Sequence, residues 1–127
     1  MSDVDIPHFL RINLHQIFNE RDSIIRRATI AKYMSVDCLF MDANAAHRGH
    51  AAIDEAIMDI HKTSQGFVFT ELAPPMILNN DTAVKFGKLR WGYAPLGEAP
   101  KVVGEDVLAI ENGKITKVLA FVEPPSA

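Results

Sequence analysis

The stretch Val102–Val122 reads Val-Val-Gly-Glu-Asp-Val-Leu-Ala-Ile, then Glu-Asn-Gly-Lys, then Ile-Thr-Lys-Val-Leu-Ala-Phe-Val. Two apolar runs of strand length flank Asn112-Gly113, a dipeptide that accepts the positive φ angles of a tight two-residue turn. The stretch therefore predicts a β-hairpin with strands over Val102–Ile110 and Ile115–Val122.

One residue of this hairpin, Asp106, conflicts with its apolar neighbours. A carboxylate on the apolar face of a sheet must be paired, hydrogen-bonded or protonated, because burying it bare and ionised costs many kcal/mol. Asp106 is therefore the first candidate for a functional residue.

Before the hairpin, the spacing of apolar residues changes from one typical of helices to one typical of strands. Apolar residues recur at spacings of three and four, which predicts helices over Ile6–Phe18, from the N-cap Asp22 to Tyr33, and over His50–Thr63. Runs rich in β-branched and aromatic residues predict strands over Val36–Asp42, Phe67–Leu72, Met76–Leu78 and Ala83–Tyr93. The loops between the later strands are too short for a crossover helix, so these strands are expected to pair antiparallel.

The third helix has a clear apolar face, formed by Ile53, Ile57 and Ile60. Its acidic residues, including Asp54 and Asp59, are expected to face away from that side. Because helices come first and strands last, the predicted fold class is α+β. We expect three N-terminal helices packed in a curved, mostly antiparallel sheet of about five or six strands.

The composition is that of an ordered globular protein. Hydrophobic residues make up 48% of the 127 residues, which favours one packed domain over residues 1–127. The formal net charge is −3 at pH 7, and we expect no nucleic-acid partner, because such a partner requires a basic patch. No uninterrupted apolar stretch approaches the roughly 20 residues that a membrane span needs. The single cysteine, Cys38, fits a reducing compartment, so a cytoplasmic protein without a membrane partner is expected.

The order of these elements and three short motifs resemble a known family. The motifs are Leu89-Arg-Trp-Gly, Val103-Gly-Glu-Asp-Val and Asn112-Gly-Lys-Ile. With the order of helices and strands, they resemble the SnoaL-like branch of the nuclear transport factor 2 (NTF2-like) superfamily over nearly the whole chain. The resemblance implies a cone in which the sheet wraps round the helices and leaves an apolar pocket at the wide end. It also implies a homodimer through the outer face of the sheet.

Two aspartates match functional positions of a better-understood member of that superfamily. Ketosteroid isomerase uses one aspartate as a base, and a tyrosine plus a protonated aspartate as its oxyanion hole. By position, Asp42 matches the base and Asp106 matches the protonated donor. The place of the tyrosine falls at Leu14, beside His15, so the sequence departs from the isomerase there. The resemblance therefore implies a two-carboxyl site rather than steroid isomerisation itself.

The chemistry of the residues leaves alternatives open for both aspartates. If they face one apolar cavity, desolvation raises both pKa values and mutual repulsion separates them, which leaves one base and one proton donor. The alternative for Asp42 is that it caps the turn after its strand. The alternative for Asp106 is an ion pair with Arg90 or with a lysine of the neighbouring strand.

Strand alternation indicates which side chains share the cavity with Asp106. If Asp106 points inward, Leu108 does too, whereas Val107 points outward, where a small apolar residue suits a dimer interface. On the preceding strand Trp91 and Tyr93 share one face, which is expected to line the cavity. Trp91 offers both bulk and an N–H donor to orient a ligand, and its alternative role is that of a core or interface aromatic.

His47 and Tyr33 complete the candidate site. His47 at the pocket rim could act as a general base, and Tyr33, just before the first strand, could supply a hydroxyl or simply pack. His15 is retained because it lies where the tyrosine is missing. His47 and His50 have the spacing of some metal-binding pairs, but Gly49 interrupts the helix that such a pair needs, so no metal is expected.

These patterns favour a protein that binds a small, largely apolar molecule with a carbonyl or hydroxyl group. If it is catalytic, we expect isomerisation, cyclisation or dehydration by proton transfer without a cofactor. Asp42 would be the base, Asp106 the acid or oxyanion donor, and Trp91 would shape the pocket. The alternative is a non-catalytic ligand carrier or protein-interaction domain that uses the same cone as a scaffold.

Overall fold

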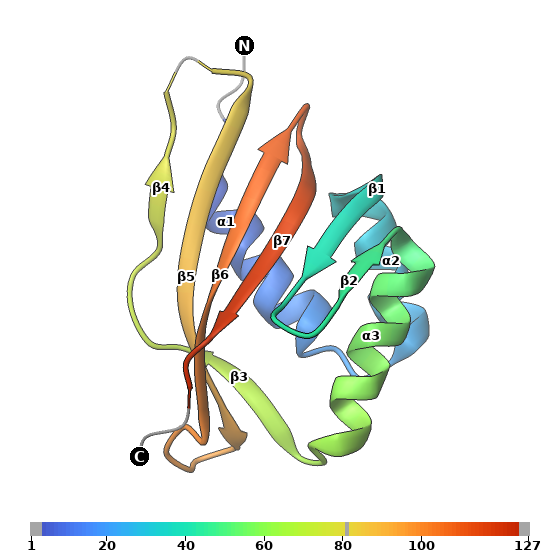
Figure 1. Ribbon diagram of the computed structural model, residues 1–127, viewed down its shortest axis with the longest axis vertical. Helices are drawn as coiled ribbons and strands as arrows, with labels where there is room; N and C mark the ends of the chain where they lie inside the picture. The colour runs from blue at the N-terminus through green and yellow to red at the C-terminus, as the bar shows by residue number, and fades with distance from the viewer. Residues whose placement is uncertain (1–3, 81, 125–127) are drawn as a thin grey trace.

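The computed structural model describes residues 4–80 and 82–124 (Figure 1). Its helices are α1 (Ile6–Arg11), the π-helix η1 (Ile12–Phe18), α2 (Ser23–Tyr33) and α3 (His50–Thr63). Its strands are β1 (Met34–Met41), β2 (Ala46–Arg48), β3 (Phe67–Glu71), β4 (Met76–Leu78), β5 (Val84–Pro95), β6 (Val102–Glu111) and β7 (Lys114–Val122). The predicted order of helices and strands is confirmed, and the short strand β2 is an addition to it.

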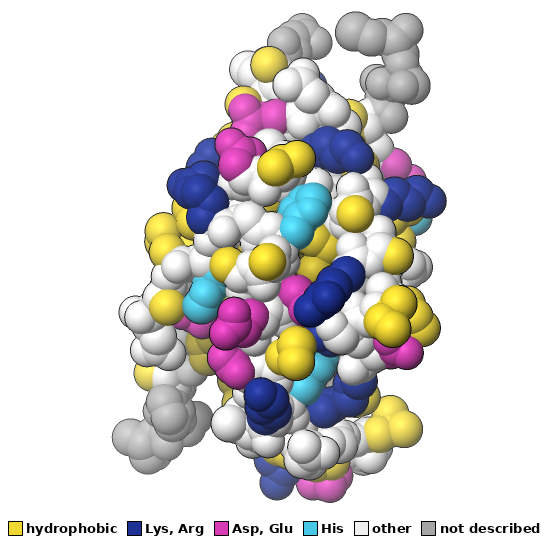
Figure 2. Space-filling model, turned by 90° about the vertical axis from the view of Figure 1, so that its right-hand side faces the viewer, with side chains coloured by type: hydrophobic (Ala, Val, Ile, Leu, Met, Phe, Trp, Pro, Cys, Tyr) yellow, Lys and Arg dark blue, Asp and Glu magenta, His cyan; other side chains and the backbone are white. Residues whose placement is uncertain are grey.

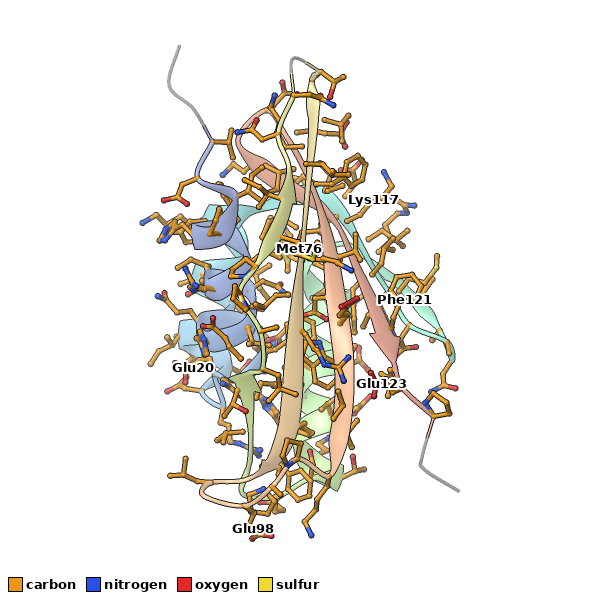
Figure 3. The ribbon with its side chains drawn as sticks, turned by 90° about the vertical axis from the view of Figure 1, so that its left-hand side faces the viewer. Glu20, Met76, Glu98, Lys117, Phe121 and Glu123 are labelled. Atoms are coloured by element: carbon orange, nitrogen blue, oxygen red, sulfur yellow. The ribbon has the colours of Figure 1, made fainter. Side chains whose placement is uncertain are left out.

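The strands form one seven-stranded sheet in the order β2-β1-β7-β6-β5-β3, with β4 also paired to β5. Neighbouring strands run antiparallel, apart from β1, which runs parallel to β7. Figure 1 shows α1 and η1 crossing behind β5, β6 and β7, and Figure 3 shows this N-terminal helical segment on one side of these strands. The expected α+β cone with a mostly antiparallel, curved sheet is therefore confirmed.

The hairpin of β6 and β7 forms as the sequence predicts. Its turn residues Asn112 and Gly113 have positive φ angles of 53° and 73°, the left-handed conformation that this dipeptide accepts. β6 pairs along its length with β5 on one edge and with β7 on the other. Asp106 therefore lies on a central strand of the sheet.

The segment α1–η1 fills the inner side of the sheet. It lies so close to β5 that a Cβ at Gly87 would be 2.5 Å from Ile6 Cγ2 and 2.9 Å from Leu10 Cδ1. In η1 the N–H of Asn19 donates to the carbonyl of Leu14, five residues earlier, at 3.0 Å. The helices and the inner face of the sheet share one core, which includes Ile6, Leu10, Ile12, Leu14, Ile17, Ile53, Ile57, Leu89, Leu108 and Ile110.

A buried ion pair joins α2 to α3. The fully buried Arg26 donates from Nε to Asp54 Oδ1 at 2.7 Å, and Arg27 donates to Asp54 Oδ2 at 2.9 Å. Asp54 is nevertheless buried, at 2% exposed, because these two arginines satisfy its carboxylate. Burial tends to raise the pKa of Asp54, but the hydrogen bonds and positive charges of Arg27 and Arg26 hold it below its usual value.

We expect Asp54→Asn to lower the free energy of unfolding by about 3–5 kcal/mol at neutral pH, because Arg26 would keep a buried charge without its partner. The folded-state pKa of Asp54 is lowered. Its contribution to the free energy of unfolding is therefore present above the unfolded-state pKa of about 3.9, and it is lost as the pH falls through the folded-state pKa. In urea unfolding, the difference in free energy of unfolding between wild type and Asp54→Asn should therefore become smaller as the pH is lowered from 7 to 3. Asp59→Asn, at an exposed position of the same helix, is the control. An equal loss in both variants would contradict the role of the ion pair.

Candidate functional site

A cavity of about 190 Å³ lies between the helices and the inner face of the sheet. Its walls are mostly apolar and aromatic, and both predicted aspartates line it. The lining residues are Phe18, Phe40, Asp42, Ile60, Phe69, Trp91, Tyr93, Val102, Asp106, Ala120 and Val122. Val122 is 52% exposed whereas Trp91 is 5% exposed, so the cavity opens near the end of β7 and Trp91 lies deep inside it.

Asp106 also lies deep in this cavity, where two side chains donate hydrogen bonds to it. The indole Nε1–H of Trp91 donates to Oδ1 at 2.9 Å, and the Nδ2–H of Asn13 donates to Oδ2 at 3.4 Å. Burial raises the pKa of the Asp106 carboxyl to about 7, although both donors act to lower it. Asp106 is therefore able to gain or lose its proton near neutral pH.

The ion pair that was the alternative for Asp106 does not form. Arg90 bonds instead to Glu123 at 2.5 Å, and Lys88 bonds to Glu105 at 3.5 Å. These cations extend from β5 on the face opposite to Trp91, as strand alternation predicts. Asp106 is thus satisfied by neutral donors, which leave its protonation open to change.

Trp91 reaches Asp106 because the residue opposite to it is a glycine. Trp91 pairs with Gly104 in the register of β5 and β6. A Cβ at Gly104 would lie 2.5 Å from Trp91 Cζ2 and 2.7 Å from the carbonyl oxygen of Phe121. The missing side chain makes room for the indole ring over β6, and Phe69 packs edge-to-face against that ring at 5.1 Å between centroids.

Asp42 directly follows β1 and lines the cavity. Its Oδ1 accepts hydrogen bonds from the N–H of Asn44 at 2.9 Å and of Ala45 at 3.0 Å, which is the turn capping that the sequence left as an alternative. None of the described residues donates to its other oxygen, Oδ2. Capping therefore fixes the carboxylate at the cavity and leaves one oxygen available for chemistry.

Three of the other predicted site residues lie in the core or on the surface. Leu14 and Leu108 are core residues, 1% and 0% exposed, and neither lines the cavity. His15 lies on the surface, where its Nε2 is 2.7 Å from Glu71 Oε2. The place of the missing tyrosine therefore contributes no polar group to this cavity.

Tyr33 and His47 also lie outside the cavity lining. Tyr33 packs edge-to-face against Phe9 at 5.8 Å between ring centroids. His47 stacks at 5.6 Å on Phe40, which itself lines the cavity. Of the predicted set, the cavity therefore brings together the two aspartates and the tryptophan.

Sequence reasoning missed Asn13, the second donor to Asp106. Asn13 is fully buried in η1 between Ile12 and Leu14, which are buried as well. A signal was present, because this polar residue falls three positions after Leu10 on the apolar stripe of the predicted helix. A buried amide on such a stripe needs a partner, and here the partner is Asp106.

The histidines of the chain are spread over separate contacts. His50, the second member of the metal-like spacing, has its Nε2 2.9 Å from the carbonyl oxygen of Ser35, and Figure 2 shows histidine side chains lying apart from one another. Within residues 4–80 and 82–124, no three His, Cys, Asp or Glu side chains gather as metal ligands would. In the same part of the chain, no helix combines the length and the apolar character needed to cross a lipid bilayer.

Comparison with solved structures relates this fold to SnoaL-like and NTF2-like proteins. A SnoaL-like family protein from Agrobacterium tumefaciens, provisionally named an isomerase, aligns with a TM-score of 0.79 at 19% identity over 92% of this chain and 96% of that one. An NTF2-like superfamily protein from Salmonella enterica gives 0.70 at 15% identity, over 97% and 90% of the two chains. A SnoaL-like protein from Jannaschia, provisionally named a polyketide cyclase, gives 0.64 at 12% identity, over 97% and 91%.

The sequence itself gives no such match: no protein-family model and no curated protein matches it. The structural matches share so little sequence identity with this chain that they show a similarity of fold alone. A fold of this kind serves many activities. The chain thus has the NTF2-like α+β fold, with a cavity that joins two carboxyl groups in an aromatic lining.

We expect the stability of the protein to depend on pH through Asp106. Its folded-state pKa of about 7 lies above the unfolded value of about 3.9, so the folded state binds this proton more tightly. That stabilisation is complete below about pH 4 and is lost as the pH rises through about 7. Asp106→Asn cannot ionise, so its free energy of unfolding should rise relative to wild type between pH 4 and pH 8 in urea unfolding.

The control is a substitution without a titratable group on the same face of β6. Leu108→Val should lower stability by about 1 kcal/mol, and by the same amount at both ends of the pH range. If the difference in free energy of unfolding between Asp106→Asn and wild type stayed constant from pH 4 to pH 8, Asp106 would not titrate in this range.

Proposed function

We propose that this protein is a cofactor-free acid–base enzyme that acts on a small, largely apolar compound with a carbonyl or hydroxyl group. The observation that carries the proposal is the pair of carboxyl groups on one apolar cavity, with Trp91 Nε1 bonded to Asp106 at 2.9 Å. The likeness of the fold to proteins provisionally named an isomerase and a cyclase supports this reaction class. A cytoplasmic location belongs to the proposal and rests on the single cysteine.

The two aspartates have different roles in this proposal, because their surroundings differ. Protonated Asp106 donates a hydrogen bond to the carbonyl oxygen of the substrate. Asp42, held in place through Oδ1, takes a proton from the carbon next to that carbonyl, and Asp106 stabilises the resulting enolate. Asp42 then returns the proton to another carbon, which completes an isomerisation, or gives it to a departing hydroxyl group, which leaves as water.

The cavity limits the size of the substrate. An engineered protein cavity of about 150 Å³ holds benzene, so a cavity of about 190 Å³ has room for one six-membered ring with one or two small substituents. Aromatic rings from Phe18, Phe40 and Phe69 on its walls favour a flat, cyclic ligand. We therefore propose single-ring ketones, such as cyclohexenones, as the substrate class.

The second candidate function is that of a non-catalytic carrier for the same kind of compound. A buried, hydrogen-bonded carboxyl such as Asp106 can bind a hydroxyl or carbonyl group without transferring its proton. Asp42 favours the enzyme, because its Oδ2 lies at the same cavity and accepts no hydrogen bond from the described residues, which suits a general base. Turnover therefore separates the two functions.

The first substrate to test is cyclohex-3-enone, whose conversion into the conjugated cyclohex-2-enone is followed by ultraviolet absorbance. We expect turnover by wild type and a kcat at least ~100-fold lower in Asp42→Asn and in Asp106→Asn, the usual effect of losing a general acid or base. Asp37→Asn is the control, since Asp37 lies on β1, the strand that Asp42 directly follows, but lines a polar groove outside the cavity.

Binding in the same samples is followed by the fluorescence of Trp91, the only tryptophan in the sequence. Quenching that accompanies turnover supports the enzyme. Quenching without turnover, tested over a series of single-ring ketones, would contradict the enzyme and favour the carrier.

We also propose that the chain forms a homodimer through the outer face of the sheet. A groove of about 210 Å³ on this side runs along β4, β5 and β6 and is lined by Met76, Ile77, Leu78, Phe86, Gly87, Lys88 and Val107. Met76 and Phe121 are each 62% exposed, and Figure 3 shows Phe121 on the side of the sheet opposite to α1. Exposed apolar side chains gathered on one face are a common mark of an interface, and a second copy would cover them.

Light scattering at micromolar concentration should give about twice the chain mass of 14.1 kDa. The double variant Met76→Glu and Phe121→Glu should give the monomer mass with an unchanged circular dichroism spectrum, because two buried charges would oppose association. Leu96→Glu, at another exposed apolar residue outside this groove, is the control and should remain a dimer. A monomeric wild type would contradict the proposal.

A further inference from the structure

We propose that Asn13 is a positioning residue for Asp106. Its side-chain amide binds Asp106 Oδ2 in both protonation forms of the carboxyl group, because a half-turn of the amide exchanges its donor for its acceptor. Asn13 is 0% exposed, and its Nδ2 donates to Asp106 Oδ2 at 3.4 Å. Its own Oδ1 accepts no hydrogen bond from the described residues. A fully buried amide oxygen without a donor is rare and needs a physical reason.

Trp91 decides which oxygen of Asp106 carries the proton. An indole N–H is a donor only, and the carbonyl oxygen of a carboxylic acid is a stronger acceptor than its hydroxyl oxygen, so Oδ1, which the indole binds, is the carbonyl oxygen of the acid form. The proton of the acid form therefore belongs on Oδ2. This is the oxygen that lies beside Asn13.

Asn13 offers a suitable group to Oδ2 in each form. Its amide carries a donor and an acceptor on the same carbon. When Asp106 is ionised, Nδ2–H donates to Oδ2, as in the structure. When Asp106 is protonated and no substrate is bound, a half-turn about the Cβ–Cγ bond of Asn13 brings Oδ1 to accept the Oδ2 proton, and in the proposed reaction the substrate carbonyl replaces Asn13 as the acceptor. The oxygen that lacks a donor in one form is then the acceptor in the other.

The strands beside Asp106 offer no competing partner. Its register neighbours are Leu89 on β5 and Ala120 on β7, and both are apolar. The charged residues nearest in sequence on β5 and β6 pair with other groups on the outer face, namely Lys88 with Glu105 and Arg90 with Glu123. The hydrogen-bond partners of Asp106 among the described residues are therefore Trp91 and Asn13.

Two other titratable groups face the same cavity, Asp42 and Tyr93. The hydroxyl of Tyr93 bonds to Ser64 Oγ at 2.5 Å, and Asp42 Oδ1 is bonded to the turn that follows it. On η1, the ionisable side chain of His15 bonds to Glu71 on the surface. Asn13 is thus the residue placed to respond when Asp106 changes its protonation.

The test follows wild-type protein by nitrogen-15 NMR from pH 5 to pH 9. We expect the side-chain amide of Asn13 and the indole N–H of Trp91 to titrate with one midpoint, and contacts between the Asn13 amide protons and the Asp106 Hβ protons to weaken below it. Asn19 is an internal control, because its amide is held by the backbone N–H and carbonyl of Phe69 at 2.7 and 2.9 Å. The Asn19 amide should stay constant, and in Asp106→Asn the signals of Asn13 and Trp91 should stay constant too.

A second measurement uses Asn13→Leu, which keeps the volume of the side chain and removes both ends of the amide. The midpoint of the Trp91 indole signal should rise by about one pH unit, because the lost bond to the carboxylate is charge-assisted and stronger than the lost bond to the acid. Ser35→Ala, which removes a buried hydroxyl outside this cavity, should leave the midpoint unchanged. An unchanged midpoint in Asn13→Leu, or an Asn13 amide that stays fixed while Trp91 titrates, would overturn the proposal.

The use of Asn13 in a reaction rests on the proposed function, whereas these titrations are made without substrate. If Asn13 and Trp91 titrate together but no ketone is turned over, the positioning role stands and the enzyme proposal fails. If turnover depends on Asp106 while the Asn13 amide stays fixed, the enzyme proposal stands and the positioning role fails.

Discussion

The hydrogen bond between Trp91 and Asp106 is the interaction on which the candidate site depends. It keeps a carboxyl group on the inward face of a central strand, where an unpartnered charge would be strongly unfavourable. Gly104 makes room for the indole ring that supplies the donor, and Asn13 supplies the second donor. Both donors are neutral, so Asp106 stays buried and still changes protonation near neutral pH. A charged partner would instead have held the carboxyl ionised.

The rest of the fold places a cavity beside this carboxyl group. Gly87 lets α1 lie directly against β5, so η1 follows the inner face of the sheet and carries Asn13 to its partner. The buried ion pair of Arg26 and Asp54 holds α2 against α3, and α3 forms part of the cavity wall. β1 runs parallel to β7 and ends at the turn that Asp42 caps. The second carboxyl group therefore reaches the same cavity from the turn that follows a different strand.

The parts of the structure that could be predicted from the sequence have local signals. The Asn112-Gly113 turn determines the hairpin, and strand alternation put Trp91 on the inward face. The parts that could not be predicted depend on contacts between distant segments. The parallel pairing of β1 and β7 leaves no mark within either strand, and the burial of Asp54 follows from arginines on another helix. A resemblance placed His15 where a tyrosine is missing, but it gave no direction for the side chain, which lies on the surface.

The most direct measurement is a carbon-13 NMR titration of the aspartate carboxyl groups in wild type and Asp106→Asn. The account predicts that Asp106 titrates near pH 7, well above the ordinary value of about 3.9. It also predicts that this titration is absent from Asp106→Asn, which assigns the midpoint to Asp106. Titration of Asp106 near or below the ordinary value would contradict the desolvated carboxyl group on which the site depends.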